Sequence, residues 1–208
     1  MKELKYISNK SYHLAGWVAI AEALLCFIIF LIIISGFVLN TDEYNTSDNI
    51  KFRLLGYSIS IMSIISIYLF VKFKRYLNHI LYFKKLNLIV NISIIWIFIV
   101  LHGVLSLLLT FENFDYDGFF LVIFSVSMFR GIIDIVTGFI LVLNWNYITN
   151  PLRLLSLIYL VLGLLGLTLF LSIFLSFLLL AAVFITFSCI FFKTKNFTSE
   201  EKSLTFSE

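Results

Sequence analysis

Charged residues are scarce in this chain of 208 residues. They make up 13% of the sequence and hydrophobic residues 61%, whereas an ordinary soluble domain has roughly 25% charged and 45–50% apolar residues. A chain of this length has too much surface for its volume to hide so many apolar side chains from water. The composition therefore excludes a soluble globular enzyme, a nucleic-acid-binding domain and a disordered regulator. It predicts a protein that lies in a lipid bilayer.

Cysteine and proline are also rare. The two cysteines, Cys26 and Cys189, lie inside apolar runs, which favours buried hydrophobic side chains over a disulfide framework. The single proline, Pro151, lies between two apolar runs, where it ends a helix at little cost. The sequence lacks a nucleotide-binding glycine loop and the HExxH, CxxC and GxSxG motifs. We therefore expect no enzymatic activity, no cofactor and no metal.

Long apolar runs fill most of the chain. A helix that crosses the hydrocarbon core needs about 20 mostly apolar residues. Four runs of this kind occupy residues 16–39, 54–71, 86–110 and 118–143. A further run over 154–192 has no charge, and as one helix it would measure roughly 58 Å, about twice the core. We therefore predict two helices there, 154–171 and 175–192, joined by a hairpin; one long tilted helix is the alternative.

The placement of basic residues predicts the topology. If both termini lie in the cytoplasm, most of the fifteen basic residues are on the inner side, and the loops around 40–53 and 111–117 hold clusters of acidic residues outside. This is the positive-inside pattern. Termini on one side require an even number of spans. We therefore predict an all-α, polytopic transmembrane helical bundle of six helices, with five as the alternative. It forms a single membrane domain over 1–208 with no soluble domain.

The linker after the second apolar run is strongly basic. Over 72–85, KFKRYLNHILYFKK, apolar residues recur at helical spacing on one face. The pattern predicts a short amphipathic helix that lies on the inner membrane surface. Its basic side chains either contact anionic lipid head groups or act only as a topology signal. These side chains are Lys72, Lys74, Arg75, Lys84 and Lys85.

Four ionisable residues lie inside the predicted spans: Glu22, His102, Arg130 and Asp134. Such groups usually face the interior of a bundle, because lipid does not satisfy them. Arg130 and Asp134 stand at i and i+4 and can pair within one helix. Counting about 1.5 Å per residue places Glu22, Arg130 and Asp134 at overlapping depths, with His102 slightly further out, and so predicts one charged cluster. The cluster is either a clamp that fixes helix pairing or a site that conducts a proton or small solute.

Small residues mark two helix-packing faces. Gly56, Ser60 and Ser63 recur at helical spacing along one face of the second span. Gly131 and Gly138 share one face of the fourth span with its two charged residues. Small side chains let a neighbouring helix approach closely, so both faces are predicted to be helix contacts.

The segment His13-Leu14-Ala15-Gly16-Trp17, followed by an apolar run, resembles the first helix of small uncharacterised bacterial polytopic membrane proteins that open with an "AGW" helix. The basic linker and the segment Arg130-Gly131-Ile132-Ile133-Asp134 are similar too. That family has no assigned activity, so the resemblance transfers no functional residue. It implies a location in the bacterial inner membrane.

Two functions remain open at the level of sequence. The first is a non-enzymatic interaction or accessory component, whose partners are the lipid bilayer and another membrane protein or a second copy of the chain. The alternative is a small proton-coupled transporter or channel that uses the charged cluster. No nucleic acid is expected as a partner, because the basic residues are distributed as a topology signal.

Overall fold

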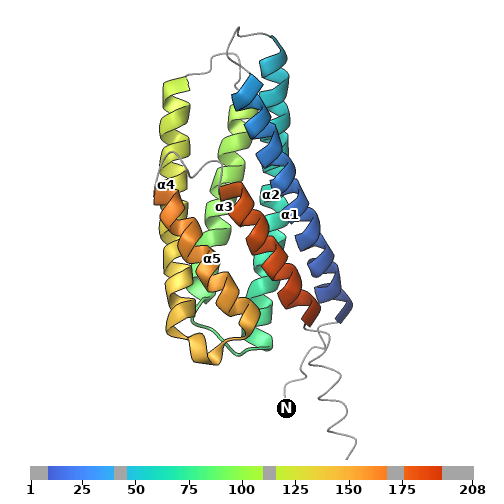
Figure 1. Ribbon diagram of the computed structural model, residues 1–208, viewed down its shortest axis with the longest axis vertical. Coiled ribbons are helices and arrows are strands. Elements are labelled where there is room, and N and C mark those ends of the chain that lie inside the picture. Colours follow the sequence, from blue (N-terminus) through green and yellow to red (C-terminus); the bar gives the residue numbers. More distant parts are fainter. Residues whose placement is uncertain (1–8, 40–45, 110–115, 168–175, 194–208) are drawn as a thin grey trace, which may run out of the picture.

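The computed structural model describes residues 9–39, 46–109, 116–167 and 176–193, and over these ranges it contains helices and no strand. The helices run side by side along one axis (Figure 1). In chain order they are α1 (Asn9–Leu39), α2 (Thr46–His79), α3 (Asn87–Leu109), α4 (Tyr116–Leu143), the short 3₁₀ helix η2 (Trp145–Tyr147) and α5 (Asn150–Leu167). A last helix, Ser176–Lys193, follows and is called the C-terminal helix below.

Five segments are long and apolar enough to cross a membrane: Ser11–Leu31, Gly56–His79, Asn87–Ser106, Asn150–Leu167 and Ser176–Lys193. The remaining long helix, α4, has 28 residues and lies in the same bundle (Figure 1). At about 1.5 Å per residue it is roughly 42 Å long, enough to span the hydrocarbon core. The all-helical membrane bundle predicted from the sequence is therefore confirmed, and no soluble domain is evident in the described ranges.

The last apolar run forms two helices, as predicted. α5 ends at Leu167 and the C-terminal helix begins at Ser176, and the two run in opposite directions (Figure 1). The predicted hairpin turn itself lies outside the described residues. The first described residues of α1 and the last of the C-terminal helix lie at the same end of the bundle, which we call the inner end. The first and last helices of a chain that crosses the bundle an even number of times begin and end on the same side.

One half of the bundle is built from α1, α2 and the C-terminal helix. Small side chains recur along the buried face of α1 at Ala15, Ala19, Ala23 and Cys26, and this spacing lets the neighbouring helices approach closely. The C-terminal helix meets α2 through Phe187, which is fully buried. Its ring centre lies 4.7 Å from that of Phe73 and 5.7 Å from that of Phe70.

The segment Ala15-Gly16-Trp17 closes the bundle between its first and last helices. Ala15 is fully buried. A Cβ atom on Gly16 would lie 2.7 Å from the ring of Phe192, so a larger residue would require that ring to shift. The indole of Trp17 meets the same ring edge-on at 5.7 Å between centres. Gly16 and Trp17 thus both contact Phe192 of the C-terminal helix, and Ala15 beside them is buried.

The other half of the bundle is the close pair α4–α5, which pack through glycines. A Cβ atom on Gly131 would lie 2.9 Å from the carbonyl oxygen of Gly163, and one on Gly138 would lie 2.8 Å from that of Ser156. Real Cβ atoms do not come so close, so the two backbones touch where side chains are missing. Gly131 and Gly138 therefore lie on the contact between α4 and α5. Gly56, Ser60 and Ser63 on α2 are buried as well.

The separate surface helix predicted over 72–85 is wrong. The second span, predicted over 54–71, continues as one helix to His79, and a turn follows in which Tyr82 has a φ of 51°. The apolar face of this segment, with Phe73, Tyr76 and Leu77, is buried in the protein core. The amphipathic pattern is therefore real, but its apolar face packs against neighbouring helices and not against the membrane surface.

We expect Gly138→Ala and Gly163→Ala each to lower the free energy of unfolding in detergent by about 1–3 kcal/mol, because the added methyl group overpacks the α4–α5 contact. The matched control is Gly103→Ala on α3, where an added Cβ would meet nothing within 4 Å. Thermal unfolding of the three purified variants measures the difference. Equal stability of all three would contradict the glycine contact.

Candidate functional site

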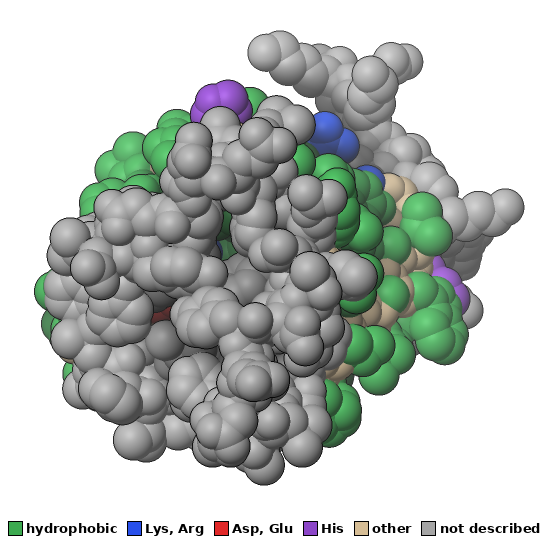
Figure 2. Space-filling view, turned by 90° about the horizontal axis from the view of Figure 1, so that it is seen from above, with side chains coloured by type: hydrophobic (Ala, Val, Ile, Leu, Met, Phe, Trp, Pro, Cys, Tyr) green, Lys and Arg blue, Asp and Glu red, His purple; other side chains and the backbone are tan. Residues whose placement is uncertain are grey.

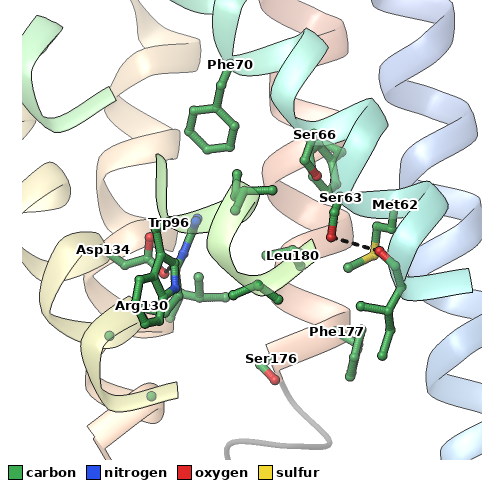
Figure 3. Close-up of a pocket in the computed structure, with 17 residues that line it drawn as sticks. Met62, Ser63, Ser66, Phe70, Trp96, Arg130, Asp134, Ser176, Phe177 and Leu180 are labelled. Atoms are coloured by element: carbon green, nitrogen blue, oxygen red, sulfur yellow. Dashed lines mark hydrogen bonds and ion pairs between the residues drawn. The ribbon is translucent and has the colours of Figure 1, made fainter. Parts of the chain in front are cut away.

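A cavity of about 250 Å³ lies among α2, α3, α4, α5 and the C-terminal helix. Its wall is mostly apolar, and apart from Ser176 of the C-terminal helix its polar side chains lie in two places. Arg130 and Asp134 lie together with Trp96 on one side, and Ser63 and Ser66 of α2 lie on the other (Figure 3). The cavity is thus an apolar space with an ion pair on one wall and hydroxyl groups on the opposite wall.

The ion pair of the cavity forms within α4. Arg130 Nε donates to Asp134 Oδ2 at 3.0 Å, the i to i+4 pairing predicted from the sequence. Asp134 is 1% exposed, whereas the Arg130 side chain is 20% exposed. The guanidinium also lies over the ring of Phe70 on α2, 5.7 Å from its centre. Such a cation–π contact favours a desolvated guanidinium. Arg130 therefore reaches from α4 toward α2 across the bundle.

Two oxygen atoms beside this pair have no hydrogen-bond partner among the described residues: Asp134 Oδ1 and the hydroxyl of Tyr159, both buried. Tyr159 belongs to α5 and interacts electrostatically with both Arg130 and Asp134. Sequence reasoning missed Tyr159. A signal was available, because Tyr159 shares one face of α5 with Ser156 and Gly163, the residues that contact α4.

Glu22 is buried as predicted, but it does not join the ion pair. Its Oε1 accepts a hydrogen bond from Ser66 at 2.9 Å, and its Oε2 is buried without a partner among the described residues. It lies on the contact between α1 and α2, where Cys26 Sγ also lies 3.5 Å from Met62 Sδ. The prediction of one cluster with Arg130 between two carboxylates is therefore wrong. Counting residues gives the depth of Glu22 in the membrane but not the direction of its side chain. The rotation of α1 about its axis points Glu22 at Ser66 of α2.

His102 is not part of the site. Its side chain is exposed on α3, whereas Trp96 and Val100 of the same helix line the cavity. Each residue advances about 100° around a helix, so His102 lies about 200° from Val100 and faces away. The prediction that His102 belongs with the intramembrane charges is wrong for this reason.

Ser66 is the residue that connects the two polar regions. It donates to Glu22 on one side and lines the cavity on the other. Ser60 and Ser63 donate instead to carbonyl oxygens of their own helix, those of Gly56 at 2.9 Å and Ile59 at 2.8 Å. Glu22 therefore lies directly behind the cavity wall, one side chain away from its interior.

Three of the five residues predicted to contact lipid head groups are engaged within the protein. Lys72 donates to Ser11, Lys74 to Asn91 at 2.7 Å and Lys85 to Asn144 at 2.8 Å. Arg75 and Lys84 are exposed. Most of this basic segment therefore joins helices at the inner end of the bundle.

The fold and the cavity define a multi-pass helical membrane protein with a polar site among its helices. No family model, no curated protein and no solved structure matches the chain. The resemblance to bacterial membrane proteins with an "AGW" first helix therefore stays a prediction. No group of three or more potential metal ligands occurs among the described residues.

We expect Ser66→Ala to destabilise the protein by about 1–3 kcal/mol, because it leaves both oxygens of the buried Glu22 carboxyl without a partner. The matched control is Ser60→Ala, which removes a hydroxyl bonded only to its own helix. Denaturant unfolding in detergent compares the two variants. Equal losses would contradict the proposed importance of the Glu22–Ser66 hydrogen bond.

Proposed function

We propose that this protein is a small transporter of the bacterial inner membrane that binds a small anion in the cavity, with Arg130 as the anchor for its charge. One observation carries the proposal. Arg130 faces the cavity, and among the described residues its hydrogen bond is the one from Nε to the Asp134 carboxylate. A guanidinium has five N–H donors in a fork that matches a carboxylate, so its Nη groups are available to a ligand.

A structural clamp has different requirements. A buried ion pair is favourable only when its geometry is good and further hydrogen bonds satisfy the remaining donors and acceptors. Here Asp134 Oδ1 is buried without a partner among the described residues, and the Arg130 side chain keeps 20% exposure. A pair left incomplete beside a cavity supports binding more than it supports a purely structural role.

The cavity wall limits the kind of solute. Apart from the ion pair and the serines, the lining side chains are apolar, among them Met62, Phe70, Trp96 and Leu180. The volume of about 250 Å³ corresponds to roughly eight water molecules at about 30 Å³ each. A small organic anion with one charged group and an apolar body fits such a site better than a fully polar anion does.

An interaction or accessory role needs a surface that distinguishes a protein partner from lipid. Most exposed side chains along α1, α3 and α5 are apolar, although His13 on α1 and His102 on α3 are exposed as well. Seen from above, hydrophobic side chains also lie along the parts of the rim that grey atoms do not cover (Figure 2). A mostly apolar surface of this kind suits contact with lipid. The geometry therefore favours the solute-binding function over the accessory function.

We expect Arg130→Gln to abolish binding of benzoate, a small carboxylate with an apolar body, while the protein still accumulates in the membrane. Trp96 lines the cavity, so tryptophan fluorescence of the purified protein measures binding, and uptake into proteoliposomes measures transport. The control is Arg153→Gln, the same change at the inner end, where Arg153 donates to Trp145 O. Uncharged benzyl alcohol is the ligand control. Unchanged benzoate binding in Arg130→Gln would refute the proposed function.

We also propose that the inner end of the bundle faces the cytoplasm, because its basic residues, such as Arg75, Lys84 and Arg153, follow the positive-inside pattern. A cytoplasm-active reporter fused after Glu208 is expected to be active. The same reporter inserted after Glu112 is expected to be inactive. The reverse result would overturn this orientation.

A further inference from the structure

The charges on the cavity wall are already balanced. Among the described lining residues, Arg130 supplies one positive charge and Asp134 one negative charge, in direct contact. Glu22 lies outside the cavity, behind Ser66, with no cation against it among the described residues. A buried charge without a counter-charge is expensive, so the surroundings of Glu22 favour its neutral acid. The empty site therefore has no net charge.

An anion that entered this site would disturb the balance. Its carboxylate would compete with Asp134 for the guanidinium, and two negative charges would then share one positive charge. Like charges close together in a medium of low dielectric constant repel strongly, and one of them takes up a proton when it can. The site therefore accepts an anion at low cost only together with one proton.

We propose, resting on the function argued above, that a small carboxylate replaces Asp134 as the partner of Arg130 and that Asp134 takes up the compensating proton. The ligand arrives as an anion and the proton arrives from solvent, forming an O–H bond on the Asp134 carboxyl. No covalent bond breaks. One negative and one positive charge enter together, so the loaded site is as neutral as the empty site. The protein thus binds anion and proton as a pair.

The surroundings of Asp134 suit this exchange. Its Oδ1 is buried and has no partner among the described residues, so a proton there displaces no hydrogen bond. The charged or titratable groups that face it are Arg130 from α4 and Tyr159 from α5. The other helices around the cavity present Ser66 and Phe70 from α2, Trp96 from α3, and Leu180 and Phe184 from the C-terminal helix. No second cation on these lining residues holds Asp134 ionised once the ligand takes Arg130.

Proton counting by titration calorimetry tests the exchange. Benzoate is added to the purified full-length protein in buffers that differ in ionisation enthalpy, and the buffer dependence gives the protons taken up per benzoate. We expect close to one proton for the wild type and for Glu22→Gln. Over the pH range in which free Asp134 is ionised, the affinity is expected to fall about tenfold per pH unit. In Asp134→Asn we expect binding with no proton uptake and no such fall.

The outcomes separate this inference from the function on which it rests. A wild-type protein that does not bind benzoate overturns both. Binding without proton uptake overturns the exchange alone, as does uptake that persists in Asp134→Asn. Uptake that is lost in Glu22→Gln and kept in Asp134→Asn assigns the proton to Glu22 and overturns the role of Asp134.

Infrared difference spectroscopy covers the case in which Asp134→Asn does not fold. On the wild type and Glu22→Gln, benzoate is expected to produce a new band of a protonated carboxyl group. If this band is missing although benzoate binds, the exchange is refuted.

Discussion

The ion pair between Arg130 and Asp134 determines how α4 sits in the bundle. Lipid does not solvate either charge, so the face of α4 that carries them is turned inward. Gly131 and Gly138 lie on that face, and turning it inward brings them against the backbone of α5. The same ion pair thus sets the rotation of α4 and the close contact with α5. Gly131 also lines the cavity beside Arg130, so the missing side chain contributes to the space that the guanidinium faces.

The two buried carboxyl groups illustrate how strongly position decides chemistry in this interior. Asp134 has a cation against it and a cavity in front of it. Glu22 has one serine hydroxyl against it and is packed among small side chains of α1. A charge is compensated at the first position and uncompensated at the second. The difference comes entirely from which neighbour each helix rotation offers, since both residues interrupt apolar runs in the same way.

Much of the fold followed from the sequence, because the bilayer restricts the options. The number and order of the long helices, the division of the last apolar run into two helices and the i to i+4 ion pair were predicted from the sequence. The lengths of α1 and α2 were underestimated, since these helices continue beyond the apolar runs. The failures at Glu22 and His102 share one cause. Depth along a helix is readable from the sequence, but rotation about the axis is not when a span is apolar on all sides. Glu22 and His102 were therefore assigned to a cluster that the structure does not form.

The segment over 72–85 shows a second limit. A basic amphipathic helix looks the same in sequence whether its apolar face meets lipid or protein. The outcome depended on the C-terminal helix, whose Phe187 stacks on Phe73 from more than 100 residues away. Ser66 and Tyr159 escaped notice for a related reason. Both are unremarkable in an apolar run, and they matter only through contacts with other helices.

The cavity lies toward the end of the bundle opposite the inner end. Gly166 near the end of α5 and Ser176 at the start of the C-terminal helix both line the cavity. Toward the inner end, by contrast, Tyr12, Phe187 and Phe191 are fully packed. On the function proposed above, a solute bound at Arg130 has the closely packed half of the bundle between it and the inner end.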